Sequence, residues 1–266
     1  YYDQSKYREA REVFRRASEA QPGNVSYLVN LGSVAFELGN AEEALEHFKQ
    51  AISREDDCAP AYERIGALYE RDEQWSKSLE AYRRASDLQP EQALFHYKAG
   101  AIEKKLGRPE EASEYLELAV ELDPGMAEAY VQLGEAYEEQ ARFDEAVQAY
   151  EQAIAIAPQE PTHHDHIGRL YRELGHLDKA LSHFEELVRL EPDSAAAYHQ
   201  LGQTFEAREQ FDEALEAYLE ACEMDPDEAD YQYSAGVMYK HLKRYPDAAA
   251  KLRRAIKLHP GHADAY

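Results

Sequence analysis

The densest potential chemistry lies in Pro-Thr-His-His-Asp-His at 161–166, where three histidines and an aspartate occupy four positions. Imidazole nitrogens bind divalent metals and act as general acids or bases near neutral pH. A structural zinc site needs four ligands, however, and a catalytic site needs three ligands and a water molecule. On a helix, His163 and His166 lie on neighbouring faces of one turn and supply only two ligands. We therefore predict packed or solvated histidines here, with no metal and no cofactor.

Signatures of other chemistry are missing from the sequence. It contains no G-x-S-x-G, no phosphate-binding P-loop, no G-x-G-x-x-G and no H-E-x-x-H. The two cysteines, Cys58 and Cys222, provide neither a disulfide framework nor the ligands of a zinc site. We predict that these residues contain no catalytic group and that the chain is not an enzyme.

The charge of the chain excludes some classes of partner. Lys and Arg number 29 and Asp and Glu number 53, which gives a net charge of −24. A chain this acidic repels nucleic-acid phosphates and anionic membrane surfaces. It has no apolar run long enough to span a bilayer, and its first residues are too charged for a signal peptide. We expect a cytoplasmic protein with no nucleic-acid partner and no direct membrane insertion.

Two residue types recur along the chain with a period of 34 residues. Prolines stand at 22, 90, 124, 158, 192, 226 and 260, with Asp56 in the one missing place, and glycines stand at 32, 66, 100, 134, 168, 202 and 236. A fixed period of this length indicates a solenoid built from repeated helix pairs. Within residues 127–160, Tyr130, Leu133 and Tyr137 form the apolar stripe of a first helix. A second helix follows and ends at Pro158.

The spacing Tyr130-x2-Leu133-Gly134-x2-Tyr137, followed by Ala146-x3-Tyr150 and Pro158, resembles the tetratricopeptide repeat. The resemblance implies an all-α solenoid, a right-handed superhelix of antiparallel helix pairs. It covers residues 1–266 as a single solenoid, with a half repeat at 1–24, seven full repeats over 25–262 and the start of another at 263–266. The full repeats begin at 25, 59, 93, 127, 161, 195 and 229. Local departures are Asp56 for the proline, Ala35 and Glu103 at an aromatic position, and Leu187 at a small-residue position.

Two further expectations follow from this register. His164 takes the position of Tyr62, Tyr130 and Tyr198, so we predict that it is a packing ring. The chain starts and ends inside a repeat without a polar cap, so we expect a fragment of a longer array whose uncapped ends allow end-to-end self-association.

In tetratricopeptide repeats the first helices line a concave groove, which takes an extended peptide or a partner helix. The resemblance places positions 2, 5, 6, 9, 12 and 13 of each repeat on that side. Candidate peptide-binding residues there are Arg64, Arg71, Tyr97, Lys98, Lys104, Lys105, Arg169, Arg172 and His199. The cations of the second and third repeats, with Tyr97 beside them, make the expected ligand an acidic segment with an apolar anchor, and the fourth repeat, which is acidic at the same positions, would repel a continuation of that segment and fix its direction. A solvated face of mixed charge is the other interpretation.

Two specialised forms of the family do not fit. Position 5 never holds Lys and position 9 never holds Asn, which disfavours the chaperone-binding clamp, and position 6 carries no ladder of Asn. We predict a non-enzymatic scaffold for protein–protein interaction. The alternative is a recruiting or regulatory arm of a larger enzyme or polysaccharide-export machine whose active part lies outside these residues.

Overall fold

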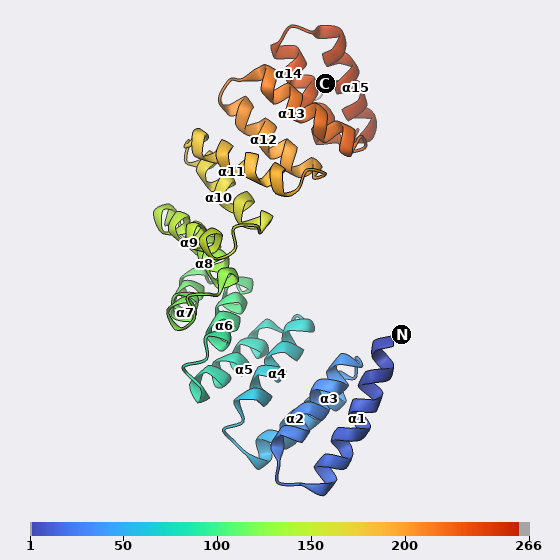
Figure 1. Ribbon diagram of the computed structural model, residues 1–266, viewed down its shortest axis with the longest axis vertical. Helices are drawn as coiled ribbons and strands as arrows, with labels where there is room; N and C mark the ends of the chain where they lie inside the picture. Colours follow the sequence, from blue (N-terminus) through green and yellow to red (C-terminus); the bar gives the residue numbers. More distant parts are fainter. Residues whose placement is uncertain (1, 261–266) are drawn as a thin grey trace. The chain divides into compact units, whose positions relative to one another are not determined.

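The computed structural model of the protein describes residues 2–260, and within that range it contains fifteen helices and no strand (Figure 1). The helices are α1 (Tyr2–Ala20), α2 (Val25–Glu37), α3 (Ala41–Arg54), α4 (Ala59–Arg71), α5 (Trp75–Leu88), α6 (Ala93–Lys105), α7 (Pro109–Leu122), α8 (Ala127–Glu139), α9 (Phe143–Ile156), α10 (Pro161–Glu173), α11 (Leu177–Leu190), α12 (Ala195–Ala207), α13 (Phe211–Met224), α14 (Ala229–His241) and α15 (Tyr245–Leu258). The expected start of a further repeat at 263–266 lies outside the described residues.

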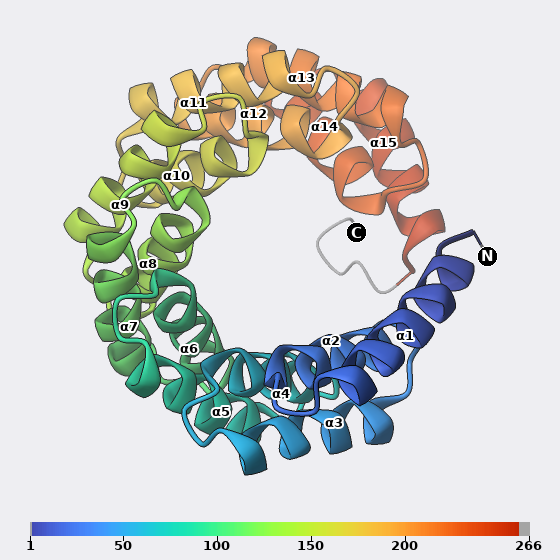
Figure 2. The ribbon, with the colours of Figure 1, turned by 60° about the horizontal axis from the view of Figure 1, so that its bottom comes forward.

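The chain divides into two compact units, unit 1 (residues 1–146) and unit 2 (residues 147–266). In unit 1 the even-numbered helices α2, α4, α6 and α8 line the inner side of the curve, and α3, α5 and α7 lie outside them (Figure 2). In unit 2 the helices α10, α12 and α14 are inside, and α11, α13 and α15 are outside. Each first helix therefore presents one face to the concave side of its own unit.

The glycine at position 8 lets the two helices of a pair approach closely. A Cβ built on Gly66 would lie 2.8 Å from the Tyr82 ring, and one on Gly202 would lie 2.6 Å from the Tyr218 ring. Both distances are below van der Waals contact, so a side chain at either glycine would overpack the pair. The ring it would strike is fully buried in both cases.

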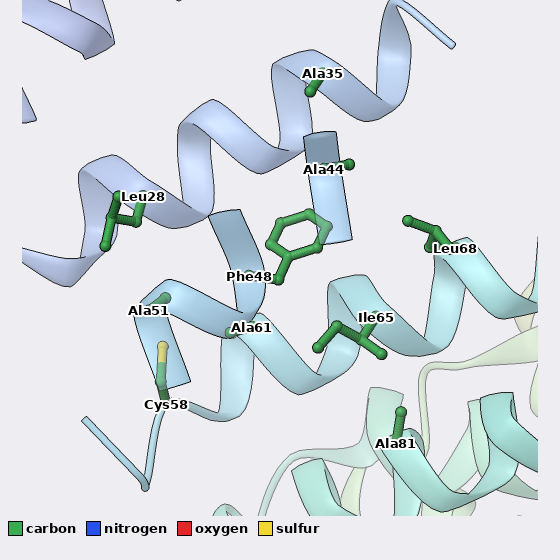
Figure 3. Close-up of a cluster of buried hydrophobic side chains, with 10 residues drawn as sticks. All are labelled: Leu28, Ala35, Ala44, Phe48, Ala51, Cys58, Ala61, Ile65, Leu68 and Ala81. Atoms are coloured by element: carbon green, nitrogen blue, oxygen red, sulfur yellow. The ribbon is translucent and has the colours of Figure 1, made fainter. Parts of the chain in front are cut away.

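The core of each unit continues from one repeat into the next. In unit 1, Phe48 of α3 is fully buried between Leu28 of α2 and Ile65 and Leu68 of α4 (Figure 3). Cys58 closes the lower end of this cluster as a small buried residue. Since apolar area is buried between neighbours, a single pair of helices cannot complete a core of its own.

Alternate repeats fill one interior position in two ways. Position 4 is tyrosine in the second, fourth and sixth repeats, and His96, His164 and Gln232 in the third, fifth and seventh. Each of these three polar side chains reaches the carbonyl oxygen of the proline six residues earlier, at 2.9, 3.2 and 3.3 Å. The polar residue thus ties the first turn of its helix to the preceding loop.

The predicted all-α solenoid with a 34-residue period is confirmed. The departures from the repeat pattern are local, as expected: Ala35 and Leu187 are buried apolar residues, and Glu103 is fully buried. Glu103 nevertheless needs partners for its buried charge.

Candidate functional site

In unit 1, ion pairs cross the concave side from one first helix to the next. The Lys98 ammonium on α6 lies 3.5 Å from a Glu70 carboxylate oxygen on α4. Lys104, further along α6, pairs with Glu135 of α8. Two of the three lysines predicted to bind a ligand, Lys98 and Lys104, therefore already bridge adjacent repeats. The Lys98–Glu70 pair is partly exposed and contributes about 0–1 kcal/mol, so its partner exchanges easily, whereas the Lys104 side chain is less exposed.

Tyr97 stands beside these lysines as a half-buried ring. The Lys98 ammonium lies 5.9 Å from the centre of that ring, within the range of a cation–π contact. Burial, together with the charges of Glu128, Glu70 and Glu135, raises the pKa of Tyr97 to about 12. The phenol is consequently a neutral hydrogen-bond donor at physiological pH, with an apolar face available for packing.

The other predicted cations of unit 1 have different surroundings. Arg64 is exposed and pairs with its chain neighbour Glu63 at 3.2 Å. Arg71 donates to the carbonyl oxygen of Phe36 at 3.2 Å and stacks over that ring at 4.3 Å, so it closes the junction between the first and second repeats. Lys105 is exposed and forms no ion pair among the residues described. The structure thus groups Tyr97, Lys98 and Lys104, leaves Lys105 at their edge, and gives Arg71 a packing role.

In unit 2, the predicted residues belong to a second surface. Arg172 donates to the carbonyl oxygen of Gln200 at 3.2 Å and lies over Phe184, and burial followed by the nearby Arg169 charge lowers the pKa of Arg172. Arg169 is exposed, 3.8 Å from Asp165. Both arginines are thus engaged with side chains or backbone of their own unit.

His199 is engaged in the same way. Its ring nitrogen contacts the Ser234 hydroxyl at 3.2 Å, between the rings of Tyr218 and Tyr231. Burial lowers the pKa of His199, which favours the neutral ring. Its contacts are all with residues of its own unit.

The histidine-rich segment opens α10. His164 is buried, as predicted, and its Nδ1 lies 3.2 Å from His183 Nδ1. His166 stacks on Tyr150, and His163 is buried. Among the described residues, no three His, Cys, Asp or Glu side chains are placed to hold a metal ion.

A buried carboxylate was missed by the sequence reasoning. Glu103 is fully buried and binds two arginines, Arg83 of α5 and Arg108 at the start of α7, the latter at 3.3 Å. The sequence did contain a signal for this buried carboxylate, because Glu103 occupies a position that is aromatic in most repeats. In the folded protein Glu103 faces Arg83. These three residues join the second and third repeats.

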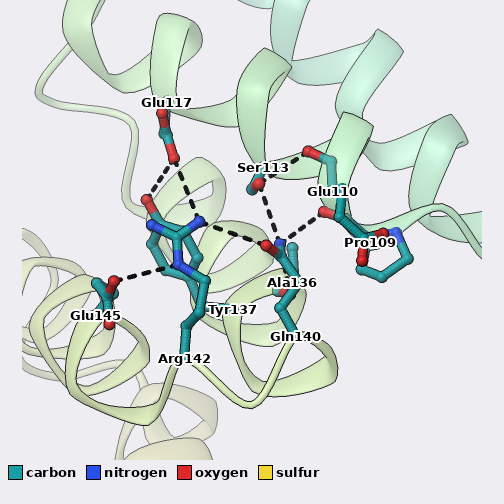
Figure 4. A network of polar contacts seen from close by, with 9 residues as sticks. All are labelled: Pro109, Glu110, Ser113, Glu117, Ala136, Tyr137, Gln140, Arg142 and Glu145. Carbon is teal, nitrogen blue, oxygen red and sulfur yellow. Dashed lines mark hydrogen bonds and ion pairs between the residues drawn. The ribbon is translucent and has the colours of Figure 1, made fainter.

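The fourth repeat has a tyrosine in place of that glutamate and forms the junction differently (Figure 4). The Tyr137 hydroxyl donates to Glu117 at 2.7 Å, and Arg142 lies over the Tyr137 ring at 4.2 Å. Gln140 donates to the carbonyl oxygen of Pro109 at 2.9 Å and to the Ser113 hydroxyl at 3.0 Å. These polar contacts therefore hold the third and fourth repeats together.

The comparisons with known proteins agree with this architecture. One family model described as tetratricopeptide repeat matches residues 1–63, 167–229 and 199–263, and a second of the same description matches 91–159 and 126–190. The chain belongs to the tetratricopeptide repeat family. Its repeated helix pairs are those of a protein-binding scaffold.

Three solved structures are similar. YrrB, described as a TPR protein with an unusual peptide-binding site, is 27% identical with a TM-score of 0.61, covering 70% of this chain and 96% of YrrB. MamA is 27% identical with a TM-score of 0.60, covering 65% of this chain and 94% of MamA. The C-terminal part of a TPR repeat-containing protein from Cytophaga hutchinsonii has a TM-score of 0.75 over 91% of this chain and 98% of its own, but at 19% identity it shows the fold alone.

A curated relative matches over a short stretch. The human protein O-mannosyl-transferase TMTC1 is 27% identical over 77 residues, which cover 29% of this chain and 9% of that protein. Within residues 2–260, no helix has the length and apolar character to cross a membrane.

Proposed function

We propose that the chain is a non-enzymatic scaffold that binds an acidic segment of a partner protein on the concave side of unit 1. The observation that carries the proposal is the grouping on α6 of a half-buried aromatic ring, Tyr97, with Lys98, Lys104 and Lys105. Aromatic rings with an apolar body and a polar tip are enriched at binding hot spots. YrrB, a structural relative, is described as having a peptide-binding site, which supports a peptide or protein ligand.

The ion pairs already present set how a ligand would bind. A partner carboxylate would replace Glu70 beside Lys98 at little net cost, because that pair is partly exposed, and could also replace Glu135 beside the less exposed Lys104. Lys105 has no ion-pair partner among the residues described, so a ligand carboxylate would displace no residue there. An aliphatic or aromatic side chain of the same segment would pack on the Tyr97 ring. The glutamates of α8 repel a continuation of the acidic segment and so fix its direction.

A peptide library tests this proposal. Random peptides displayed on phage are selected on the full chain, and the affinity of the selected peptides is measured for the variant K98E/K104E/K105E. We expect the peptides to be rich in Asp and Glu with one apolar residue, and their affinity to fall at least tenfold in the variant. Binding should also weaken with added salt, since the Debye length is about 8 Å at physiological ionic strength.

The matched control carries the same change of net charge on the outer helices. Lys49 of α3 and Lys77 and Arg84 of α5 are exposed, and their reversal to glutamate should leave binding unchanged. Equal affinity for K98E/K104E/K105E and the native chain would reject the unit 1 site. Arg169, Arg172 and His199 of unit 2 would then be the residues to reverse.

A second candidate function is a recruiting arm of a larger enzyme or export machine. The 77-residue match to the protein O-mannosyl-transferase TMTC1 favours it, because that protein is named for an enzymatic activity. The sequence of the full-length gene separates the two candidates. A catalytic or membrane segment encoded in the same reading frame supports the second, and repeats alone support the first.

A further inference from the structure

A pocket in unit 2 involves part of the histidine-rich segment that opens α10. It lies between the start of α10, the end of α11 and the start of α12, and its volume is about 250 Å³. Leu187, Ala196 and Ala197 supply apolar wall, and Asp165 and Glu191 supply carboxylates. No lysine or arginine is among its lining residues. The pocket therefore combines an apolar wall with two negative charges.

Both carboxylates are available to a ligand. Asp165 has its nearest cation, Arg169, 3.8 Å away on the same helix, and that arginine is half exposed. Glu191 has neither an ion pair nor a side-chain hydrogen bond among the residues described. At the equivalent position of other repeats, Asp123 and Asp225 accept the backbone N–H two residues further on, at 3.0 and 3.2 Å. The longer Glu191 side chain makes no such bond, which leaves its charge free.

The size and polarity of the pocket select one class of side chain. Lysine and arginine carry a flexible apolar stem and a cationic head, and they commonly bury the stem while the head meets an acceptor. Here the stem would lie along Leu187 and Ala197, and the head would meet Asp165 and Glu191. The same carboxylates repel an acidic side chain.

One feature of the pocket opposes a cation. The start of α12 carries a partial positive charge of about half an elementary charge. Ser194 caps this terminus, because its hydroxyl accepts the Ala197 N–H at 3.4 Å. Two full negative charges on Asp165 and Glu191 outweigh the remaining partial charge.

We propose that this pocket binds a single lysine or arginine side chain of a partner polypeptide. The proposal rests on the proposed function only in taking a polypeptide as the ligand. It concerns the opposite charge and a different unit from the acidic-segment site. A partner bound at both sites would carry acidic and basic residues in separate parts of its sequence.

The experiment uses N-acetyl-arginine methylamide and N-acetyl-lysine methylamide as probes of the full chain. Methyl-labelled leucine and alanine provide NMR signals from Leu187, Ala196 and Ala197 in the pocket wall. We expect saturable shifts of these methyl groups with at least one of the two cationic probes. Asp165→Asn and Glu191→Gln should each weaken its binding at least threefold, and the double variant should abolish saturation.

Controls separate the pocket from general attraction to an acidic protein. N-acetyl-citrulline methylamide has nearly the shape of the arginine probe without its charge, and it should bind at least fivefold more weakly. Glu185→Gln removes an exposed carboxylate of α11 that does not line the pocket, and should change nothing. Equal binding of the citrulline probe, or equal weakening by Glu185→Gln, would overturn the proposal. Neither result bears on the acidic-segment site of unit 1, whose test uses other variants.

Discussion

At the scale of single residues, one junction of the chain is built with its charges reversed. The Tyr137 hydroxyl donates to Glu117, and the Tyr171 hydroxyl donates to Glu151 at 2.9 Å. In each case the glutamate precedes the tyrosine by 20 residues. Between the second and third repeats the same spacing joins Arg83 to Glu103. The acidic group has moved from the outer helix to the buried position, and an arginine has replaced it outside.

Arg83→Glu should destabilise unit 1, because it places a second carboxylate against the buried Glu103. The variant loses a charge-assisted hydrogen bond, worth about 1.5–3 kcal/mol, and adds a repulsion. Thermal unfolding followed by circular dichroism measures the loss. Adding Glu103→Tyr to this variant recreates the Tyr137–Glu117 arrangement and should recover at least about 1 kcal/mol. A double variant no more stable than Arg83→Glu alone would mean that the two positions are not coupled.

The contact between His164 and His183 predicts a dependence of stability on pH. Burial, and then the neighbouring His164, lower the pKa of His183 from 6.5 to about 4. Above pH 6.5 the ring is neutral in both the folded and the unfolded chain. As the pH falls from about 6.5 to about 4, His183 binds a proton in the unfolded chain but stays neutral in the folded chain. The folded state therefore loses stability over this range.

The measurement is the thermal midpoint at several pH values for the native chain and for His183→Phe. The native midpoint should fall between pH 6.5 and 4 more steeply than that of the variant, because phenylalanine does not titrate. His176→Gln removes an exposed histidine and is the matched control, with the native slope. Parallel slopes for all three proteins would show that His183 does not carry the effect.

At the scale of helices, the sequence alone predicts the pairs and their contacts. Gly66 and Gly202 repeat because the helices of a pair meet there with no room for a side chain, and such a constraint acts in every repeat. The ion-pair partners of charged residues cannot be predicted in the same way, because each pair depends on the side chain that the neighbouring repeat carries at that place. Lys98 was predicted to face the concave side, but its pairing with Glu70 depends on side-chain length and on the offset between α4 and α6.

The turn inside each pair provides a prediction at this scale. Position 15 has a positive φ, held by Gly39, Gly107 and Gly175 in three repeats and by Ala141, at φ 56°, in another. Glycine adopts this conformation without the clash that Cβ causes. Ala141→Gly should therefore raise stability by about 1 kcal/mol, and Gly107→Ala should lower it by a similar amount. Thermal midpoints of the two variants test both signs, and a lower midpoint for Ala141→Gly would contradict the argument.

At the scale of the whole molecule, the question is how far a local defect spreads. The stability of a solenoid is approximately the sum of its repeats and of the contacts between neighbours. The division into unit 1 and unit 2 gives this expectation a boundary that experiment can look for. Gly66→Leu and Gly202→Leu form a matched pair, one in each unit, because each would drive a side chain into a buried tyrosine ring.

Each variant should lose about 1–3 kcal/mol, as overpacked cores do, and the loss should be local. Native-state hydrogen exchange gives the protection of every helix separately. Gly66→Leu should accelerate exchange in α2 to α7 and leave α12 to α15 unchanged, while Gly202→Leu should do the reverse. Gly23→Ala, which adds a methyl group where no atom lies within 4 Å, is the control and should alter neither set. Equal acceleration of all helices by either leucine variant would show that the chain unfolds as one cooperative body, and the nearest-neighbour description would then fail.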